Sequence, residues 1–202
     1  IKEHKRIIFN GNGYDDHWIR EATEKRGLLN LRTTPDAEAA VLDPKAIALL
    51  TSHKVMSETE LRSRYEISME NYVKTVNIEA MTMIDLAEKS ILPAIESYSA
   101  VLAGNLAKKN AVLPNLSGKY EKGKIEKLSS LLEEASAALS ELEDAVIALK
   151  NLTDVTEAAF FVRDAVIEKM NTLRVICDEA ETLTAKEYWP MPTYGDLLFG
   201  VR

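Results

Sequence analysis

The chain has 202 residues, of which 46% are hydrophobic and 28% charged, and its formal net charge is −7. This composition is typical of an ordinary globular protein and excludes a largely disordered chain. The acidic balance argues against nucleic acid as the main partner, and every apolar run is far shorter than the roughly 18 residues that span a bilayer. The only cysteine, Cys177, excludes an internal disulfide and is typical of a reducing compartment. We therefore expect a cytoplasmic protein that binds neither nucleic acid nor membranes.

The first segment predicts the end of a sheet. Residues 6–9 are a short, apolar, β-branched run that ends at Asn10-Gly11-Asn12-Gly13, which is the pattern of a buried strand followed by a turn. No second strand is evident, and a lone strand cannot pair its backbone groups. The chain also begins without a methionine. We therefore expect residues 1–14 to be the last part of an upstream sheet domain.

The paired glycines of this turn resemble a phosphate-binding loop, but the pattern is incomplete. A dinucleotide fingerprint needs a third glycine where Asp16 stands, and no Gly-Lys-Ser or Gly-Lys-Thr follows. The carboxylates of Asp15 and Asp16 would also repel a phosphate at the start of the next helix. A structural turn is therefore the favoured interpretation, and a nucleotide-binding switch ranks last among the functions considered.

Residues 15–56 predict short connecting helices. Asp15 or Asp16 can cap a helix that continues to about Arg26 and ends at Gly27. Thr34-Pro35 and Asp43-Pro44 should each open another short helix, since proline is tolerated at the first helical position.

Residues 57–187 predict an antiparallel bundle of three long helices. The first should begin at the capping box of residues 57–60 and continue to about Lys109, with a kink near Pro93. Its apolar stripe makes ten steps over 37 residues, which is close to the period of a straight helix. The stripe consists of Tyr65, Met69, Tyr72, Val76, Ala80, Met83, Ala87, Ile91, Ala94, Tyr98 and Leu102.

A polar loop is expected over residues 115–124, before the second long helix. That helix carries a heptad seam, which predicts packing along another helix. The seam consists of Ile125, Leu128, Leu132, Ala135, Leu139, Leu142, Val146 and Leu149. The third long helix should start near Thr153 or Asp154 and end near Thr182, with an apolar stripe at Ala158, Phe161, Ala165, Leu173, Ile176 and Ala180.

Residues 188–202 form a tail rich in aromatic residues and proline. Its prolines and Gly195 argue against a regular helix, while its large apolar side chains would be exposed unless they dock on another surface. The candidate docking residues are Tyr188, Trp189, Tyr194, Leu197, Leu198 and Phe199.

Few other residues suggest chemistry. His4, His17 and His53 have no partner at metal-ligand spacing, and Cys177 lies on an apolar stripe, as a buried structural cysteine would. Lys119, Lys122, Lys124 and Lys127 could form a small anion contact, although ordinary solvation of a loop is favoured. The sequence therefore predicts no catalytic, cofactor-binding or metal-binding residue within this chain.

Four separated blocks resemble the C-terminal region of type III glutamine synthetase: "IIFNGNGYDDHW", "KRGLLNLRTTPDA", "RYEISMENYVKTVNIEAMTMIDLAEKSILPAI" and "YWPMPTYGDLLF". The resemblance covers nearly the whole chain and is least distinctive over residues 119–154. It implies a parent enzyme that uses ATP and magnesium to join ammonia to glutamate through a γ-glutamyl phosphate. It also implies that the catalytic residues lie on the upstream sheet domain, so this chain should be inactive alone.

The resemblance further implies a homo-oligomer in which the helical region and tail help subunits to pack. The competing interpretation is a standalone helical scaffold or interaction module, which the heptad seam alone would explain.

Overall fold

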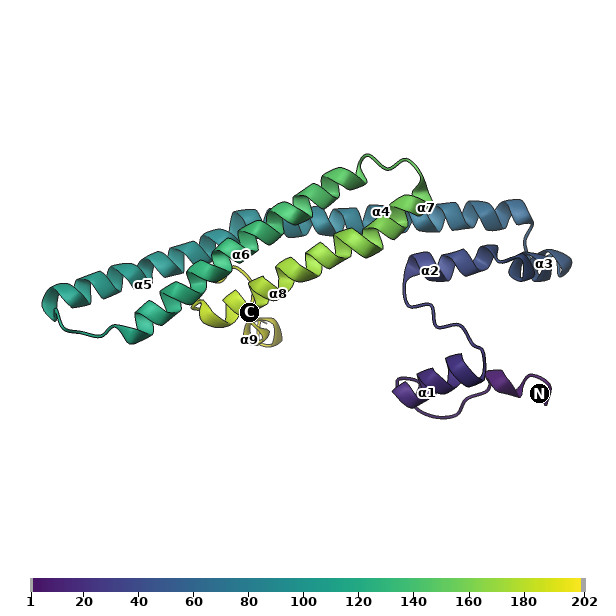
Figure 1. Ribbon diagram of the computed structural model, residues 1–202, viewed down its shortest axis with the longest axis horizontal. Coiled ribbons are helices and arrows are strands. Elements are labelled where there is room, and N and C mark those ends of the chain that lie inside the picture. Colours follow the sequence, from purple (N-terminus) through teal and green to yellow (C-terminus); the bar gives the residue numbers. More distant parts are fainter. Residues whose placement is uncertain (1, 201–202) are drawn as a thin grey trace. The chain divides into compact units, whose positions relative to one another are not determined.

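The computed structural model describes residues 2–200, with the side chain of Arg6 left out. The fold is mainly α, as predicted, and the described residues contain no strand (Figure 1). They divide into two compact units, Ile1–Met69 and Glu70–Arg202, which we describe separately. None of the helices in the described part is long and apolar enough to cross a membrane.

The first unit is a series of short helices. It contains the 3₁₀ turns η1 (Lys5–Ile7) and η3 (Ala40–Leu42), the π-helical turn η2 (Glu21–Lys25), the helices α1 (Asp16–Arg20), α2 (Thr34–Ala39) and α3 (Pro44–Ser52), and the start of α4 (Glu58–Leu86).

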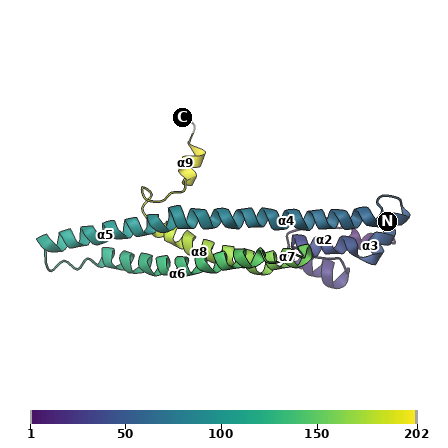
Figure 2. The same cartoon turned by 90° about the horizontal axis from the view of Figure 1, so that it is seen from above.

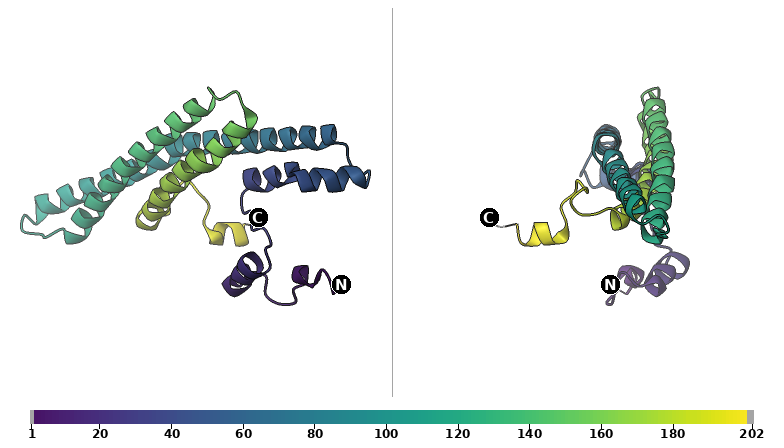
Figure 3. Two further views of the ribbon diagram at one scale, coloured as in Figure 1. Left: turned by 45° about the vertical axis from the view of Figure 1, so that its right-hand side comes forward. Right: turned by 90° about the vertical axis from the view of Figure 1, so that its left-hand side faces the viewer.

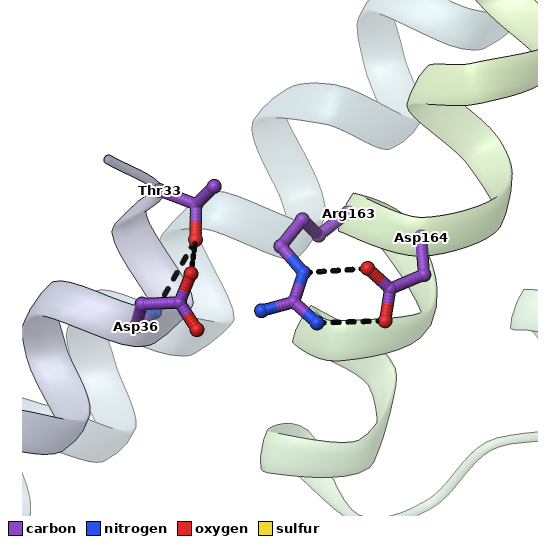
Figure 4. A network of polar contacts seen from close by, with 4 residues as sticks. All are labelled: Thr33, Asp36, Arg163 and Asp164. Carbon is purple, nitrogen blue, oxygen red and sulfur yellow. Dashed lines mark hydrogen bonds and ion pairs between the residues drawn. The ribbon is translucent and has the colours of Figure 1, made fainter. Parts of the chain in front are cut away.

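Side-chain caps explain where these helices begin. The carboxylate of Asp15 accepts a hydrogen bond from the His17 amide at 2.9 Å, and that of Asp43 accepts one from the Lys45 amide at 2.8 Å. The hydroxyl of Thr33 accepts from the Asp36 amide at 3.4 Å (Figure 4). The predicted short helices are therefore confirmed, because each N-cap accepts from one of the first free amides.

The predicted strand over residues 6–9 stays a prediction. Lys5–Ile7 form a 3₁₀ turn, and Ile8 is extended with φ −91° and ψ 124°. A strand forms only against a partner strand, and the described residues supply none.

The second unit is a bundle built from two helical hairpins (Figures 1 and 2). Its elements after α4 are η4 (Ala87–Ile91), α5 (Leu92–Val112), α6 (Lys119–Leu149), α7 (Val155–Phe161), η5 (Val162–Val166), α8 (Ile167–Leu183) and α9 (Tyr194–Leu198). α4, η4 and α5 follow one another without a break, as do α7, η5 and α8. α6 packs against both α5 and α8 (Figure 3), so the predicted antiparallel bundle is confirmed.

The core of this unit follows the predicted apolar stripes. Leu128, Leu142 and Leu173 are fully buried, and they belong to one continuous cluster with Val76 and Ile95. Every residue of the three predicted stripes is buried or half-buried. The capping box at the start of α4 is also confirmed, since the Ser57 amide donates to the Glu60 carboxylate at 2.7 Å and the Glu60 amide donates to the Ser57 hydroxyl at 3.2 Å.

Pro93 is accommodated by a change of helical winding. It follows the π-helical turn Ala87–Ile91 and occupies the first turn of α5. Proline has no amide hydrogen and its ring crowds the preceding turn, and both proline and π-helical turns are places where long helices bend.

The loop predicted over residues 115–124 is confirmed only as far as Gly118, because α6 begins at Lys119 and Gly123 lies inside it. The carboxylate of Glu121, in the first turn of α6, pairs with the ammonium of Lys109 on α5. A glycine inside a helix costs roughly 1 kcal/mol, and this contact between helices helps to offset that cost.

The tail also differs from expectation, because it contains the short helix α9. The Thr193 hydroxyl accepts from the Asp196 amide at 3.2 Å, and the Thr193 amide donates to the Asp196 carboxylate at 2.9 Å. This capping box was the sequence signal that could have revealed α9.

Candidate interface surfaces

The turn that links η1 to α1 is held by contacts along its own length. Asn12 Oδ1 accepts a hydrogen bond from the Tyr14 amide at 3.0 Å. The rings of Phe9 and Trp18 stack with their centroids 3.7 Å apart. A Cβ at Gly11 would lie 2.7 Å from the Phe9 ring, so any other residue at this position would force the Phe9 ring to shift.

Arg26 closes this cluster from the other side. Its guanidinium lies 4.7 Å from the centre of the Trp18 ring and donates to the Ile8 carbonyl at 2.8 Å. It also pairs with Glu21, and this hydrogen bond lowers the pKa of the Glu21 carboxyl. The turn is therefore a structural joint, and it leaves the side chains of Ile7, Tyr14 and Leu29 largely exposed.

The tail residues separate into two groups. Tyr188 and Trp189 are half-buried: the Tyr188 ring lies 5.3 Å from that of Tyr98, and Trp189 packs against the bundle core. In contrast, the exposed fractions of the α9 surface are high, at 84% for Tyr194, 65% for Leu197, 71% for Leu198 and 83% for Phe199. The first pair attaches the tail to the bundle, and an interface role for all six residues stays a prediction.

An ion pair fixes the start of α9. The ammonium of Lys186 lies 2.9 Å from Asp196 Oδ1. This hydrogen bond, with those from Thr193, lowers the pKa of the Asp196 carboxyl, so the carboxylate is charged at neutral pH. Lys186 is the counter-charge for Asp196, the single acidic residue of α9.

A groove of about 480 Å³ lies between the α4–η4 segment and α8. Its walls are mostly apolar, and they include Ile78, Met83, Leu86, Met170, Leu173, Cys177 and, from the tail, Met191. Among the lining residues, only Glu79, Arg174 and Asp178 are charged, and Arg174 and Asp178 pair at 3.4 Å. Burial raises the pKa of the Cys177 thiol to about 11, so this cysteine is a poor nucleophile at neutral pH.

Two of the four candidate lysines, Lys124 and Lys127, are engaged in contacts between helices. Lys127 pairs with Glu179 at 2.7 Å, and Lys124 Nζ donates to the Leu183 carbonyl at 2.7 Å, so these two lysines connect α6 to α8. Arg163 and Asp164 form a two-pronged pair at 2.6 and 2.8 Å (Figure 4), which lowers the pKa of the Asp164 carboxyl.

Metal-ligating side chains do not converge in the described part of the chain. Over residues 2–200, no three His, Cys, Asp or Glu side chains are grouped so that they could hold a metal ion.

Comparison with known proteins gives a consistent result. Residues 1–110 match the family described as "Glutamine synthetase C-terminal domain". The chain belongs to this family. A glutamine synthetase of Butyrivibrio fibrisolvens is 36% identical over 199 residues, and the type-3 glutamine synthetase of Dictyostelium discoideum is 31% identical over 205 residues. A glutamine synthetase of Bacteroides fragilis is 30% identical over 199 residues.

These alignments cover nearly all of this C-terminal domain but only a part of each relative. They span 98, 98 and 96% of this chain, and 28, 27 and 27% of the respective relatives. The resemblance predicted from the four sequence blocks is therefore confirmed, and the domain corresponds to little more than a quarter of a glutamine synthetase.

Proposed function

We propose that this domain is the helical C-terminal part of a cytoplasmic glutamine synthetase, which joins ammonia to glutamate with ATP and magnesium. The family match and the share of each relative that it covers carry this proposal. Catalysis is assigned to a separate, upstream sheet domain, so this domain is inactive alone.

Over residues 2–200, no group of His, Cys, Asp and Glu side chains could hold the magnesium ion of such an enzyme. Magnesium in nucleotide sites is held by carboxylates and phosphates in octahedral geometry. The carboxylates of Asp15 and Asp16 follow the glycine turn, but no third potential ligand joins them within residues 2–200. We therefore assign no step of the reaction to this domain.

Two exposed apolar surfaces support a packing role, one toward the upstream domain and one in a homo-oligomer. The exposed side chains of Ile7, Tyr14 and Leu29 border the N-terminal joint, where an upstream domain would dock. The exposed apolar side chains of α9 form the second surface, and contiguous apolar surface of this kind marks sites of protein contact. We assign the first surface to the upstream domain and the second to neighbouring subunits.

Size and activity of the native protein test the proposal together. An antibody against this domain should detect a polypeptide several times larger than 22.5 kDa on a denaturing gel of a cell extract, and that polypeptide should make glutamine when supplied with ATP, ammonia and glutamate. Deletion of residues 188–202 from it should change the oligomer seen by native mass spectrometry. An unchanged oligomer would remove the tail from the proposal.

A standalone helical scaffold is the second candidate, and the continuous core of the second unit favours it. It predicts a native polypeptide of 22.5 kDa in the same extract. It also predicts slow amide exchange over residues 2–14, whereas a joint released from its upstream domain should exchange rapidly.

A further inference from the structure

Two consecutive Asn-Gly pairs stand in the turn between η1 and α1. Asn10, Gly11, Asn12 and Gly13 are all exposed. Asparagine is a thermolabile residue, because the backbone nitrogen of the next residue can attack its side-chain carbonyl carbon. Glycine hinders this attack least, since it carries no Cβ and leaves the backbone free to rotate. The turn therefore holds two asparagines in the sequence context that most favours deamidation.

The attacking nitrogens of both pairs are free. Within residues 2–200, the amide N–H groups of Gly11 and Gly13 donate no hydrogen bond. Most backbone amides of a folded chain are paired with an acceptor, which holds the proton that the nitrogen must lose during the attack. Neither glycine has this protection, so both nitrogens are available as nucleophiles.

The two asparagine side chains differ in how they are held. Asn12 Oδ1 accepts a hydrogen bond from the Tyr14 amide at 3.0 Å, and the Asn12 carbonyl oxygen accepts one from the Asp15 amide at 3.3 Å. These bonds restrain the side chain and the backbone that ring closure has to rotate. Among the side chains that the structure describes, none forms a hydrogen bond with that of Asn10. Asn10 can therefore turn toward the Gly11 nitrogen without breaking a bond.

We propose that Asn10 is a site of spontaneous deamidation and that the reaction loosens the joint at this turn. The Gly11 nitrogen attacks Asn10 Cγ and loses its proton, the side-chain nitrogen leaves as ammonia, and a cyclic succinimide forms. Water then opens the ring at either of its carbonyl groups, which gives aspartate or isoaspartate. Each event consumes one water molecule and releases one ammonia molecule, and it needs no enzyme or cofactor.

Isoaspartate changes the turn through the length of its backbone. It routes the chain through Cβ and Cγ of residue 10, which adds one methylene group between Phe9 and Gly11. These two residues approach closely, since a Cβ on Gly11 would lie 2.7 Å from the Phe9 ring. A longer backbone between them displaces that ring from Trp18, with which it stacks at 3.7 Å. Deamidation should therefore release the contact that holds the turn.

Incubation of the full-length protein at mildly alkaline pH tests the site. Mass spectrometry of the peptide that carries both asparagines, with electron-transfer fragmentation, locates each product and separates isoaspartate from aspartate. Asn10 should react roughly two- to tenfold faster than Asn12, because reaction at Asn12 must first break a hydrogen bond. In concentrated guanidinium chloride the two rates should become nearly equal, since glycine follows both residues and the fold no longer restrains either.

Asn10→Gln separates the modification from its consequence. Glutamine keeps the amide group, but its extra methylene group makes ring closure much slower, so residue 10 should stay unmodified while Asn12 still reacts. Hydrogen exchange over residues 9–26 should become faster when the native protein is incubated. Exchange in the Asn10→Gln variant should stay unchanged after the same incubation.

Three results would overturn the proposal. The first is a folded full-length protein that forms no product at Asn10 while the unfolded chain does, which would mean that the fold protects the site. The second is a rate at Asn12 that equals or exceeds the rate at Asn10. The third is equal loosening of the native protein and Asn10→Gln. None of these readouts depends on glutamine synthesis, so the proposal fails or stands separately from the proposed function.

Discussion

The ring of Phe9 lies face to face with that of Trp18, with centroids 3.7 Å apart and planes 10° from parallel. The two rings are nine positions apart in sequence, so this stack fixes the path of the whole Asn-Gly-Asn-Gly turn. It depends on Gly11, because a side chain there would meet the Phe9 ring. Gly11 therefore serves a close approach of ring and backbone, where the sequence pattern had raised the alternative of a phosphate; Gly13 has open space around it.

Gly11→Ala should loosen this joint. The added Cβ would lie 2.7 Å from the Phe9 ring and displace it from Trp18, which removes a stacking contact of roughly 0.5–1.5 kcal/mol. Hydrogen exchange measured by mass spectrometry should show faster exchange over residues 9–26. Gly13→Ala is the matched control, since nothing lies within 4 Å of a Cβ at that position. Equal exchange in the two variants would show that the stack does not hold the turn.

Two glycines at the start of α6 should respond to alanine with opposite signs. Gly118 is the N-cap with φ 53°, and a Cβ there would collide with Leu106. Gly118→Ala should therefore lower the free energy of unfolding by about 1–2 kcal/mol. Gly123 lies within the helix with open space around it, so Gly123→Ala should raise that free energy by roughly 0.5–1 kcal/mol. Chemical denaturation checks both signs, and a destabilised Gly123 variant would contradict the helical start at Lys119.

Much of the fold was predictable because its signals are local. Ser57 and Glu60 form their capping box within one turn, and the stripe that includes Val76 and Leu102 depends only on helical periodicity. The heptad seam from Ile125 to Leu149 correctly predicted a helix that packs along another helix, for the same reason. Each of these patterns is readable without knowing what packs against it.

The features that were missed depend on distant contacts or on a weak local signal. α6 extends through Gly123 while Lys109, on the preceding helix, pairs with Glu121, and sequence spacing does not reveal that pair. The groove combines Leu86 with Cys177, which come from helices far apart in the chain. The capping box of α9 was present at Thr193 and Asp196, but the neighbouring prolines and Gly195 outweighed it in the sequence interpretation.

The Lys109–Glu121 pair should make the stability of the bundle depend on pH. The hydrogen bond from Lys109 lowers the pKa of the buried Glu121 carboxyl below its ordinary value of 4.5. A lowered pKa means that the pair stabilises the folded state above about pH 4.5 and loses this contribution as the pH falls through the lowered pKa. The native protein should therefore be more stable than Glu121→Gln at pH 7, with a gap that narrows in acid.

Chemical denaturation at a series of pH values measures that gap. Glu126→Gln is the control, because Glu126 is an exposed glutamate of the same helix. Its stability relative to the native protein should vary little over the same pH range. A Glu121→Gln gap that stays constant down to pH 3 would show that the ion pair does not contribute through its charge.

Cys177 should react slowly with alkylating reagents until the pH is high. Burial in the wall of the groove raises the pKa of its thiol to about 11, compared with 9.0 for an ordinary cysteine. Only the thiolate attacks iodoacetamide, so at pH 8 the reactive fraction is about 100-fold smaller than that of an ordinary cysteine.

The alkylation rate, measured by mass spectrometry of the peptide that contains Cys177, should rise steadily up to about pH 11. Val175→Cys in a Cys177→Ala background provides an exposed cysteine on the same helix and should reach its plateau at a lower pH. A native Cys177 that is fully reactive at pH 8 would mean that the groove wall opens to solvent and that burial does not suppress the thiolate.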